Sequence, residues 1–439
     1  MEASVALFPF RVDPSLFCRR ALTALALVAL APGAVRGQDA FPLAEAPAVK
    51  ALIDEALARN PEILATRERT AAARPRAARA SALADPMVSL GYDKGDAWLP
   101  GSGGDTGPRI AVSQELPFSG KRRLMRDVLN REVELTRHAT GAAALGITYA
   151  VRKAIADLLL ARETLDIIAD QRRATSDIEE LSRSRYSAGL TGQVDVLRAQ
   201  AELARLDQMR QHEEGLVDSA IAELNRLRAA PAGSSVELGV RLRDLVGRVI
   251  EVPAVESLLE RAHGDSPEVR AAVTMVERGG LAVDLARRNL KPDFVLSSAY
   301  AFRGSLPDRW TVEVGVILPA YRKNKQRLAI DEAEAELRQV RAEHDAAGLR
   351  TRAAVERAHA DFKAAVLEAR TIEREVLVIG GLAVESALAG FRSGQTPFIS
   401  VLEAHNALYS DRRQHAELLF HILWHSALLD AFGMERQTS

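Results

Sequence analysis

The sequence contains few aromatic residues, almost no net charge and no long apolar run after its first forty residues, and each shortage excludes a class of protein. Aromatic residues make up 5% of the chain, and the hydrophobic share of 47% is mostly alanine and leucine, which suits long helices better than a β-sandwich or a nucleotide-binding sheet. The formal net charge of −1 gives no attraction for nucleic acid. No later segment has about eighteen apolar residues in a row, so a membrane could be entered only with strands.

The single cysteine lies in a predicted export signal, residues 1–37. Basic residues that include Arg19 and Arg20 precede an uncharged run from Ala21 to Ala34, and small residues follow it as in a cleavage site. Cys18 lies before this run, so it cannot be the acylated cysteine of a lipoprotein. The adjacent arginines leave twin-arginine export open beside the general secretory route.

The rest of the chain is a duplication. The stretch YSAGLTGQVDVLRAQ, which begins at Tyr186, returns as FRSGQTPFISVLEAH, which begins at Phe391. Pro61 and Pro267 are 206 positions apart, and other matching positions keep nearly the same spacing and order. We therefore predict a first structural repeat over residues 38–230 and a second over residues 231–439.

Each repeat contains two short segments in which apolar residues recur at every second position. They cover residues 87–92, 109–116, 294–302 and 310–318. In the last segment Trp310, Val312 and Val314 share one face, and Thr311 and Glu313 lie on the other. This alternation is typical of tilted transmembrane strands, and soluble hairpins packed on helices are the alternative. Because about eight strands are needed to close a barrel, a membrane barrel would require several chains.

Long helices account for most of the remaining residues. A first helix is predicted over residues 50–82 and 253–290, with breaks at Asn60-Pro61 and Ser266-Pro267. Helical hairpins follow over residues 120–187 with 194–229, and over 325–388 with 398–432, each turning at a glycine-containing tip. Their near-sevenfold apolar period predicts long coiled-coil pairs. The predicted fold class is mostly α with a small β part.

The repeated order of helix, strand pair and long helical hairpin, with the pattern Y-x-x-G-x-x-x-x-x-D-V-L-x-A at the first tip, resembles the TolC-type outer-membrane efflux proteins. The resemblance implies a homotrimer in which four strands per chain form one twelve-stranded β-barrel, continued by a tunnel of twelve helices across the periplasm. It implies a passive exit duct in the outer membrane of a Gram-negative envelope, in contact with outer-membrane lipid, a periplasmic adaptor and an inner-membrane pump. No enzymatic activity and no cofactor are expected.

The substrate is less defined than the fold. The stretches LADPMVSLGY and QELPFSGKRR are similar to the metal-exporting branch of the family, which makes heavy-metal cations a candidate substrate. A type I protein-secretion channel is an alternative. A periplasmic coiled-coil adaptor or scaffold is another, although an adaptor needs one hairpin and this sequence has two.

The sequence shows no pattern for catalysis or metal binding. No Gly-rich phosphate loop follows a strand, and no serine lies in a nucleophile elbow, so an exported enzyme is disfavoured. His421 and His425 could share a metal at their spacing of four residues. No acidic residue completes an H-E-x-x-H pattern, and packing along a helix is the preferred interpretation.

Positions of the family's periplasmic gate and adaptor-docking tips can be carried over from the resemblance. The gate maps onto Asp195, Phe391, Ser400 and Glu403, and the tips map onto Gly189, Leu190, Thr191, Gly394, Gln395 and Thr396. Ser400 stands where an acidic residue is usual. Phe391 replaces a tyrosine whose hydroxyl could bond the Asp195 carboxylate, so the closed state is expected to depend more on packing. Glu403 alone would place three carboxylates around a trimer axis, which favours cations.

Basic residues open both long helices that follow the strands. They are Lys121, Arg122, Arg123, Arg322, Lys323 and Lys325. Cations at a helix N-terminus oppose the helix dipole, so either these helix ends are simply solvated or the side chains contact lipid phosphates at the periplasmic membrane face.

Overall fold

The computed structural model describes residues 47–93, 107–246, 252–304 and 307–431, and all structural statements below concern these residues. The predicted export signal, residues 1–37, lies outside them. The described residues belong to one unit that covers residues 41–439.

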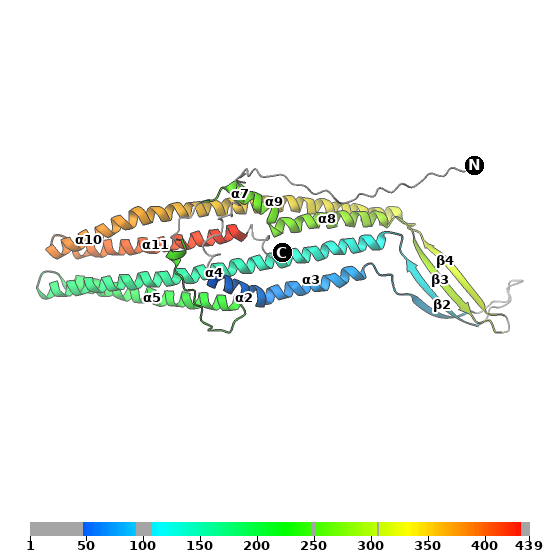
Figure 1. Cartoon of the computed structure of the whole chain (residues 1–439), viewed down its shortest axis with the longest axis horizontal. Helices are drawn as coiled ribbons and strands as arrows, with labels where there is room; N and C mark the ends of the chain where they lie inside the picture. The colour runs from blue at the N-terminus through cyan, green and yellow to red at the C-terminus, as the bar shows by residue number, and fades with distance from the viewer. Residues whose placement is uncertain (1–46, 94–106, 247–251, 305–306, 432–439) are drawn as a thin grey trace, which may run out of the picture. The chain divides into compact units, whose positions relative to one another are not determined.

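The same series of elements occurs twice along the chain (Figure 1). The first series is α2 (Pro47–Arg59), α3 (Pro61–Arg79), β1 (Met87–Asp93), β2 (Gly107–Leu116), α4 (Lys121–Ser187) and α5 (Gln193–Leu227). The short helix α6 (Leu242–Val246) follows. The second series is α7 (Val255–Asp265), α8 (Pro267–Arg288), β3 (Asp293–Ala301), β4 (Arg309–Ile317), the π-helical turn η1 (Arg322–Gln326), α9 (Arg327–Thr371), the π-helical turn η2 (Ile372–Val376), α10 (Leu377–Ser393) and α11 (Phe398–Ala431).

The helix breaks occur where the sequence places an X-Pro pair. Asn60 adopts an extended backbone conformation, and its side-chain Oδ1 accepts a hydrogen bond of 2.8 Å from the N–H of Glu62, which caps α3. Its Nδ2 donates to the carbonyl of Leu227 at 2.8 Å, so this residue also fixes the end of α5. The long helix of the second repeat is interrupted by η2, which the sequence did not indicate.

The four strands form one antiparallel sheet in the order β1-β2-β3-β4. The pairing of β2 with β3, in which Leu116 faces Phe294 and Arg109 faces Ala301, joins the two repeats. One face of the sheet is apolar and exposed, and Leu90, Trp310 and Val314 on it are 79%, 70% and 70% exposed. The other face is small or polar. The predicted strands and their alternation are confirmed.

The helices pack as two long hairpins. α4 lies against α5, and α9 and α10 lie against α11, while α4 also contacts α8 and α11. The hairpin tips lie together at the end of the helical part that is far from the sheet (Figure 1). Small and aliphatic side chains fill the core around Phe362, Leu158, Leu224 and Leu423, each fully buried.

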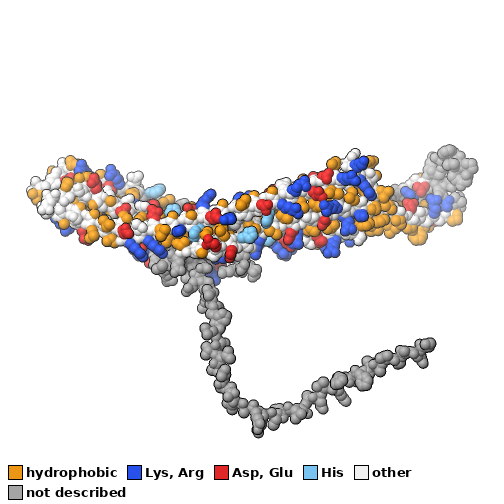
Figure 2. Space-filling model, turned by 90° about the horizontal axis from the view of Figure 1, so that it is seen from above, with side chains coloured by type: hydrophobic (Ala, Val, Ile, Leu, Met, Phe, Trp, Pro, Cys, Tyr) orange, Lys and Arg blue, Asp and Glu red, His pale blue; other side chains and the backbone are white. Residues whose placement is uncertain are grey.

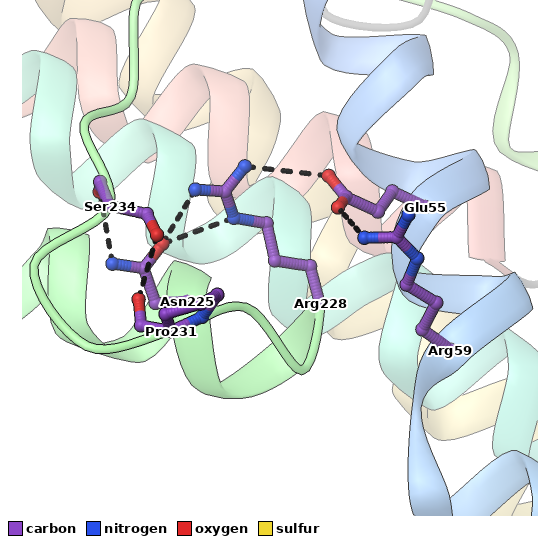
Figure 3. Close-up of polar contacts among 6 residues, drawn as sticks. All are labelled: Glu55, Arg59, Asn225, Arg228, Pro231 and Ser234. Carbon is purple, nitrogen blue, oxygen red and sulfur yellow. Dashed lines mark hydrogen bonds and ion pairs between the residues drawn. The ribbon is translucent and has the colours of Figure 1, made fainter.

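Polar contacts fix the connection between the two hairpins (Figure 3). Arg228, just after α5, donates to Asn225 Oδ1 at 2.7 and 3.1 Å and to Glu55 Oε2 on α2 at 3.4 Å. Asn225 Nδ2 in turn donates to the carbonyl of Ser234 at 3.0 Å. The chain therefore leaves the first hairpin along a defined path.

Within the described residues, one helical segment is apolar enough to cross a membrane, judged by its length and composition alone. It runs from Arg322 to Ser393, and 17% of its most apolar window is buried. By composition it is an exception to the expectation that only strands could enter a membrane. On α10, Val378, Ile379 and Leu382 are 55%, 66% and 62% exposed. Because α10 packs along α11, this segment is one arm of a helical hairpin.

A buried ion pair secures the joint between the repeats. The Lys121 ammonium lies 2.8 and 2.9 Å from the Asp293 carboxylate oxygens and 3.0 Å from the carbonyl of Lys291. The N–H of Phe118 donates to the same carboxylate at 2.6 Å. Lys121 is 4% exposed. Of the two alternatives predicted for this side chain, solvation and contact with lipid phosphate, neither describes Lys121, because the protein itself supplies the acceptors.

We expect the Lys121→Met variant to lose roughly 2–4 kcal/mol of stability, because it leaves a largely buried carboxylate without its partner. Lys291→Met removes an exposed lysine from the same junction and should cost less than about 0.5 kcal/mol. Thermal unfolding of the detergent-purified protein measures both. Equal melting temperatures for the two variants would show that the ion pair does not stabilise the joint.

Candidate functional site

The two hairpin tips have the same backbone geometry. Gly189 and Gly394 have φ of +72° and +78°, a left-handed conformation that glycine adopts without strain. The N–H of Leu190 donates to the carbonyl of Arg185 at 2.9 Å, and the N–H of Gln395 donates to that of Gly390 at 2.8 Å. The repeated sequence therefore encodes two equivalent helix ends. Leu190 is 64% exposed at the first tip.

Arg185 links the two tips, and sequence reasoning missed it. Its guanidinium carbon lies 4.9 Å from the centre of the Phe391 ring, and its Nη1 donates to the carbonyl of Arg392 at 3.1 Å. The equivalent position in the second repeat is Gly390, where a Cβ would collide with the Thr396 side chain. This difference between otherwise matching repeats is the signal in the sequence from which Arg185 could have been found.

Phe391 and Asp195 each have partners other than one another. Phe391 is 3% exposed, and its ring meets that of Phe398 edge-on, with centroids 5.8 Å apart. These two rings belong to a cluster with Ile178, Ala199, Val401 and Leu402. The Asp195 carboxylate accepts a hydrogen bond from the Thr191 hydroxyl and lies 3.8 Å from Arg198. Asp195 thus stabilises its own tip, and Phe391 packs between the tips.

The two remaining gate positions lie on the first turns of α11. Ser400 is half-buried, and its N–H donates to the carbonyl of Pro397 at 3.2 Å. Glu403 is exposed one turn further along the helix. Its carboxylate is therefore accessible from outside the chain.

A second residue that the sequence did not single out, His405, is buried beside the predicted gate positions. It is 2% exposed, and neither ring nitrogen makes a well-aligned hydrogen bond to a described residue. Its ring lies 4.7 Å from that of Tyr409. Burial lowers the pKa of His405, the Arg412 charge lowers it further, and the Glu202 carboxylate opposes these effects. The imidazole is therefore held neutral between the hairpins.

Amide and guanidinium groups beside His405 connect α4 with α11. Gln171 Nε2 donates to Asn406 Oδ1 at 3.1 Å, and Arg413 Nη1 donates to Gln171 Oε1 at 2.9 Å. The region of the predicted gate positions is thus held by an apolar cluster at the tips and a polar layer further from them.

The other predicted residues lie away from the tips. Arg322, Lys323, Lys325 and Arg123 are exposed and Arg122 is half-buried, all near the helix starts that follow the strands. His421 and His425 lie with their ring centroids 6.1 Å apart, and the His425 ring is stacked on Trp424 at 5.4 Å. In the described part of the chain, no group of three or more His, Cys, Asp or Glu is placed to hold a metal ion.

Known proteins share both the sequence pattern and the fold. The family profile described as outer membrane efflux protein matches residues 52–232 and 258–426, one segment in each repeat. Protein CyaE of Bordetella pertussis (strain Tohama I) is 26% identical over 265 residues, which cover 58% of this chain and 55% of that protein. The chain therefore spans about half the length of the curated relative that it matches.

Solved structures of outer-membrane channels have the same fold. CusC is 17% identical with a TM-score of 0.75, and the match covers 88% of this chain and 92% of that one. VceC from Vibrio cholerae is 18% identical with a TM-score of 0.72, covering 88% and 96%. The channel OprN is 19% identical with a TM-score of 0.73, covering 88% and 90%.

The neutral His405 predicts a pH dependence. A histidine whose pKa is lowered in the folded state does not reduce the free energy of unfolding at pH values above about 6.5, its ordinary pKa. As the pH drops below about 6.5, the unfolded state binds a proton more readily than the folded state, so the free energy of unfolding falls. The loss is limited to about 1.4 kcal/mol for each unit by which burial lowers the pKa. The melting temperature should therefore fall between about pH 7.5 and 5.5 in the wild type.

In the His405→Leu variant this fall should be smaller, whereas replacing the exposed His212 with Leu should leave it unchanged. Identical pH profiles for the wild type and His405→Leu would contradict the prediction.

Proposed function

The chain belongs to the outer membrane efflux protein family, and from this we propose that it is the outer-membrane exit duct of a tripartite efflux system. The observation that carries the proposal is the four-stranded sheet, whose apolar face is exposed at residues such as Leu90 and Trp310. A soluble sheet buries its apolar face, whereas lipid leaves such a face stable. The duct would be a passive conduit and not an enzyme.

The strand edges support assembly as a homotrimer. β1 and β4 are the outer strands of the sheet, and in lipid their unpaired backbone groups would be costly. Pairing β4 of one copy with β1 of the next satisfies both edges and gives twelve strands from three chains. The exposed apolar residues Val378, Ile379 and Leu382 on α10 give the helical part a further surface for contact between copies.

The tips are the proposed docking surface for a periplasmic adaptor, through which an inner-membrane pump would be reached. At this end Gly189, Leu190, Gly394 and Gln395 are exposed, and Thr191 and Thr396 are half-buried. The closed state would depend on packing of Phe391 against Phe398 and on the bridge from Arg185. Asp195 contributes by fixing the first tip.

Cations are the proposed cargo class, and heavy-metal cations remain the candidate substrate. Glu403 is exposed on α11, and three copies would place three carboxylates around a common axis, a ring that favours cations. Protein secretion is the alternative. A carboxylate ring does not by itself suit a polypeptide of arbitrary charge, so the ionic selectivity of the duct separates the two.

We expect the protein to remain in the outer membrane after high-salt washing and to be a trimer in detergent by light scattering. A peripheral adaptor would be washed off. In planar bilayers the wild type should be cation-selective, and Glu403→Gln should move the reversal potential towards zero. A monodisperse monomer would contradict the trimer. Equal ion selectivity of the wild type and of Glu403→Gln would contradict the assignment of Glu403 to the gate.

The docking surface is tested by substitutions that spare the glycines. Leu190→Asp and Gln395→Lys change only exposed tip side chains, so we expect loss of export with normal trimer formation and outer-membrane location. Leu216→Asp is a matched control, because Leu216 is 44% exposed on α5 between the tip and the end of that helix. Export that survives both tip substitutions would place docking elsewhere.

A further inference from the structure

A hollow lies where the helical part meets the sheet. It has a volume of about 430 Å³ and is lined by the chain between α3 and β1, the link from β2 to α4, and the first turns of α4. Its lining includes Ser81, Leu83, Phe118, Arg122, Arg123 and Arg126. On the face drawn in Figure 2, Lys and Arg side chains lie at the end of the helical part that adjoins the sheet.

The hollow has an excess of positive charge. Arg123 and Arg126 lie 3.6 and 3.8 Å from the same carboxylate, that of Asp127, and such exposed pairs are weak. Among the described residues no carboxylate forms an ion pair with Arg122. Lys121, by contrast, is turned away into its pair with Asp293. Two guanidinium groups therefore share one carboxylate and the third, that of Arg122, has no carboxylate partner among the described residues, so an anion would be bound favourably.

The start of α4 adds to this attraction. Gly120 has φ of +89°, no side chain caps the helix, and its first turn contains no acidic residue. The helix has 67 residues and presents its positive dipole end here, where the N–H of Lys121 donates to the carbonyl of Phe118 at 3.1 Å. The arginines and the helix end thus favour the same kind of ligand.

The residues around the hollow indicate which kind of molecule bears the anionic group. Leu83 on the lining is 41% exposed, and five positions along the chain the apolar face of the sheet begins with Val88, which is 64% exposed. A ligand in this place contacts cations at one end and apolar surface at the other. A phosphodiester with acyl chains matches both, because its phosphate meets the arginines while its chains lie along the strands.

We propose that this hollow binds the headgroup phosphate of a membrane phospholipid, with Arg122 and Arg126 as phosphate ligands and Leu83 and Phe118 against the glycerol and first acyl carbons. The inference rests on the proposed function, since it requires the apolar face of the sheet to lie in a lipid leaflet. In this proposal the basic residues that follow β2 belong to a defined binding pocket. They then do more than contribute a diffuse positive charge to the surface.

The test uses the full-length assembled protein, purified in a non-ionic detergent and stripped of lipid. Phosphatidylglycerol in mixed micelles should raise the melting temperature of the wild type in a saturable manner. The double variant Arg122→Gln/Arg126→Gln should need at least about tenfold more lipid for half of the effect. Arg338→Gln/Arg341→Gln removes two exposed arginines from α9 and should behave like the wild type. Equal titrations for both double variants would overturn the proposal.

Two probes applied to the wild type do not depend on how the variants fold. Diacylglycerol has the same chains without the phosphate, and inorganic phosphate has the anion without the chains. Neither should match phosphatidylglycerol. Equal stabilisation by diacylglycerol would show that only the acyl chains bind, and equal stabilisation by inorganic phosphate would show a free-anion site. Either result would overturn the proposal.

The location of the wild type separates this inference from the function on which it rests. A protein that is washed from the outer membrane would overturn the exit duct and the lipid site together. A protein that stays in the membrane and conducts ions, but shows equal titrations for the two double variants, would overturn the lipid site alone.

Discussion

The pairing of β2 with β3 is the interaction on which the rest of the structure depends. Each repeat supplies a two-stranded hairpin that would be marginal alone, and this pairing turns two hairpins into one sheet with a continuous apolar face. The backbone bonds set the register, and the pair of Lys121 with Asp293 fixes the helix that follows. Because α4 begins just after β2 and α8 ends just before β3, α4 and α8 lie side by side, and α8 also packs along α9. Both hairpin tips lie at the end far from the sheet (Figure 1).

Duplication gives the two hairpins one geometry, and divergence gives them different chemistry. Position 173 is arginine in the first repeat, and its equivalent in the second is Val378, which is 55% exposed. Asp177 corresponds in the same way to Leu382. The second hairpin therefore has apolar side chains where the first has charged ones. Such a difference suits a second hairpin that faces protein and a first hairpin that faces water.

Arginine has opposite roles at the hairpin tips and at the junction between the helices and the sheet. At the tips, Arg185 stacks on a buried phenylalanine and links the hairpins within the chain. At the junction, Arg122, Arg123 and Arg126 line a hollow in which only Arg123 and Arg126 lie near a carboxylate, that of Asp127, so positive charge is available to an external anion. The difference lies in the surroundings, because a charged group is satisfied internally only where the fold brings an acceptor or an aromatic face to it.

The sequence by itself determined the elements of this protein. Strand faces, helix breaks at Asn60-Pro61 and the glycine turns at Gly189 and Gly394 follow from local backbone geometry, which a pattern of neighbouring residues expresses directly. It also indicated the duplication and the family. It did not reveal the π-helical interruption η2, for which no local pattern was evident.

Tertiary structure decided which side chains meet. Lys121 appeared to be one of several exposed basic residues until Asp293, which is 172 positions away, came within 2.8 Å of it. His405 became a buried neutral imidazole, and Phe391 packed against Phe398 while Asp195 bonded within its own tip. Such partners are set by the packing of elements distant in sequence, and the free energy of a charge or a ring depends on those partners far more than on its neighbours along the chain.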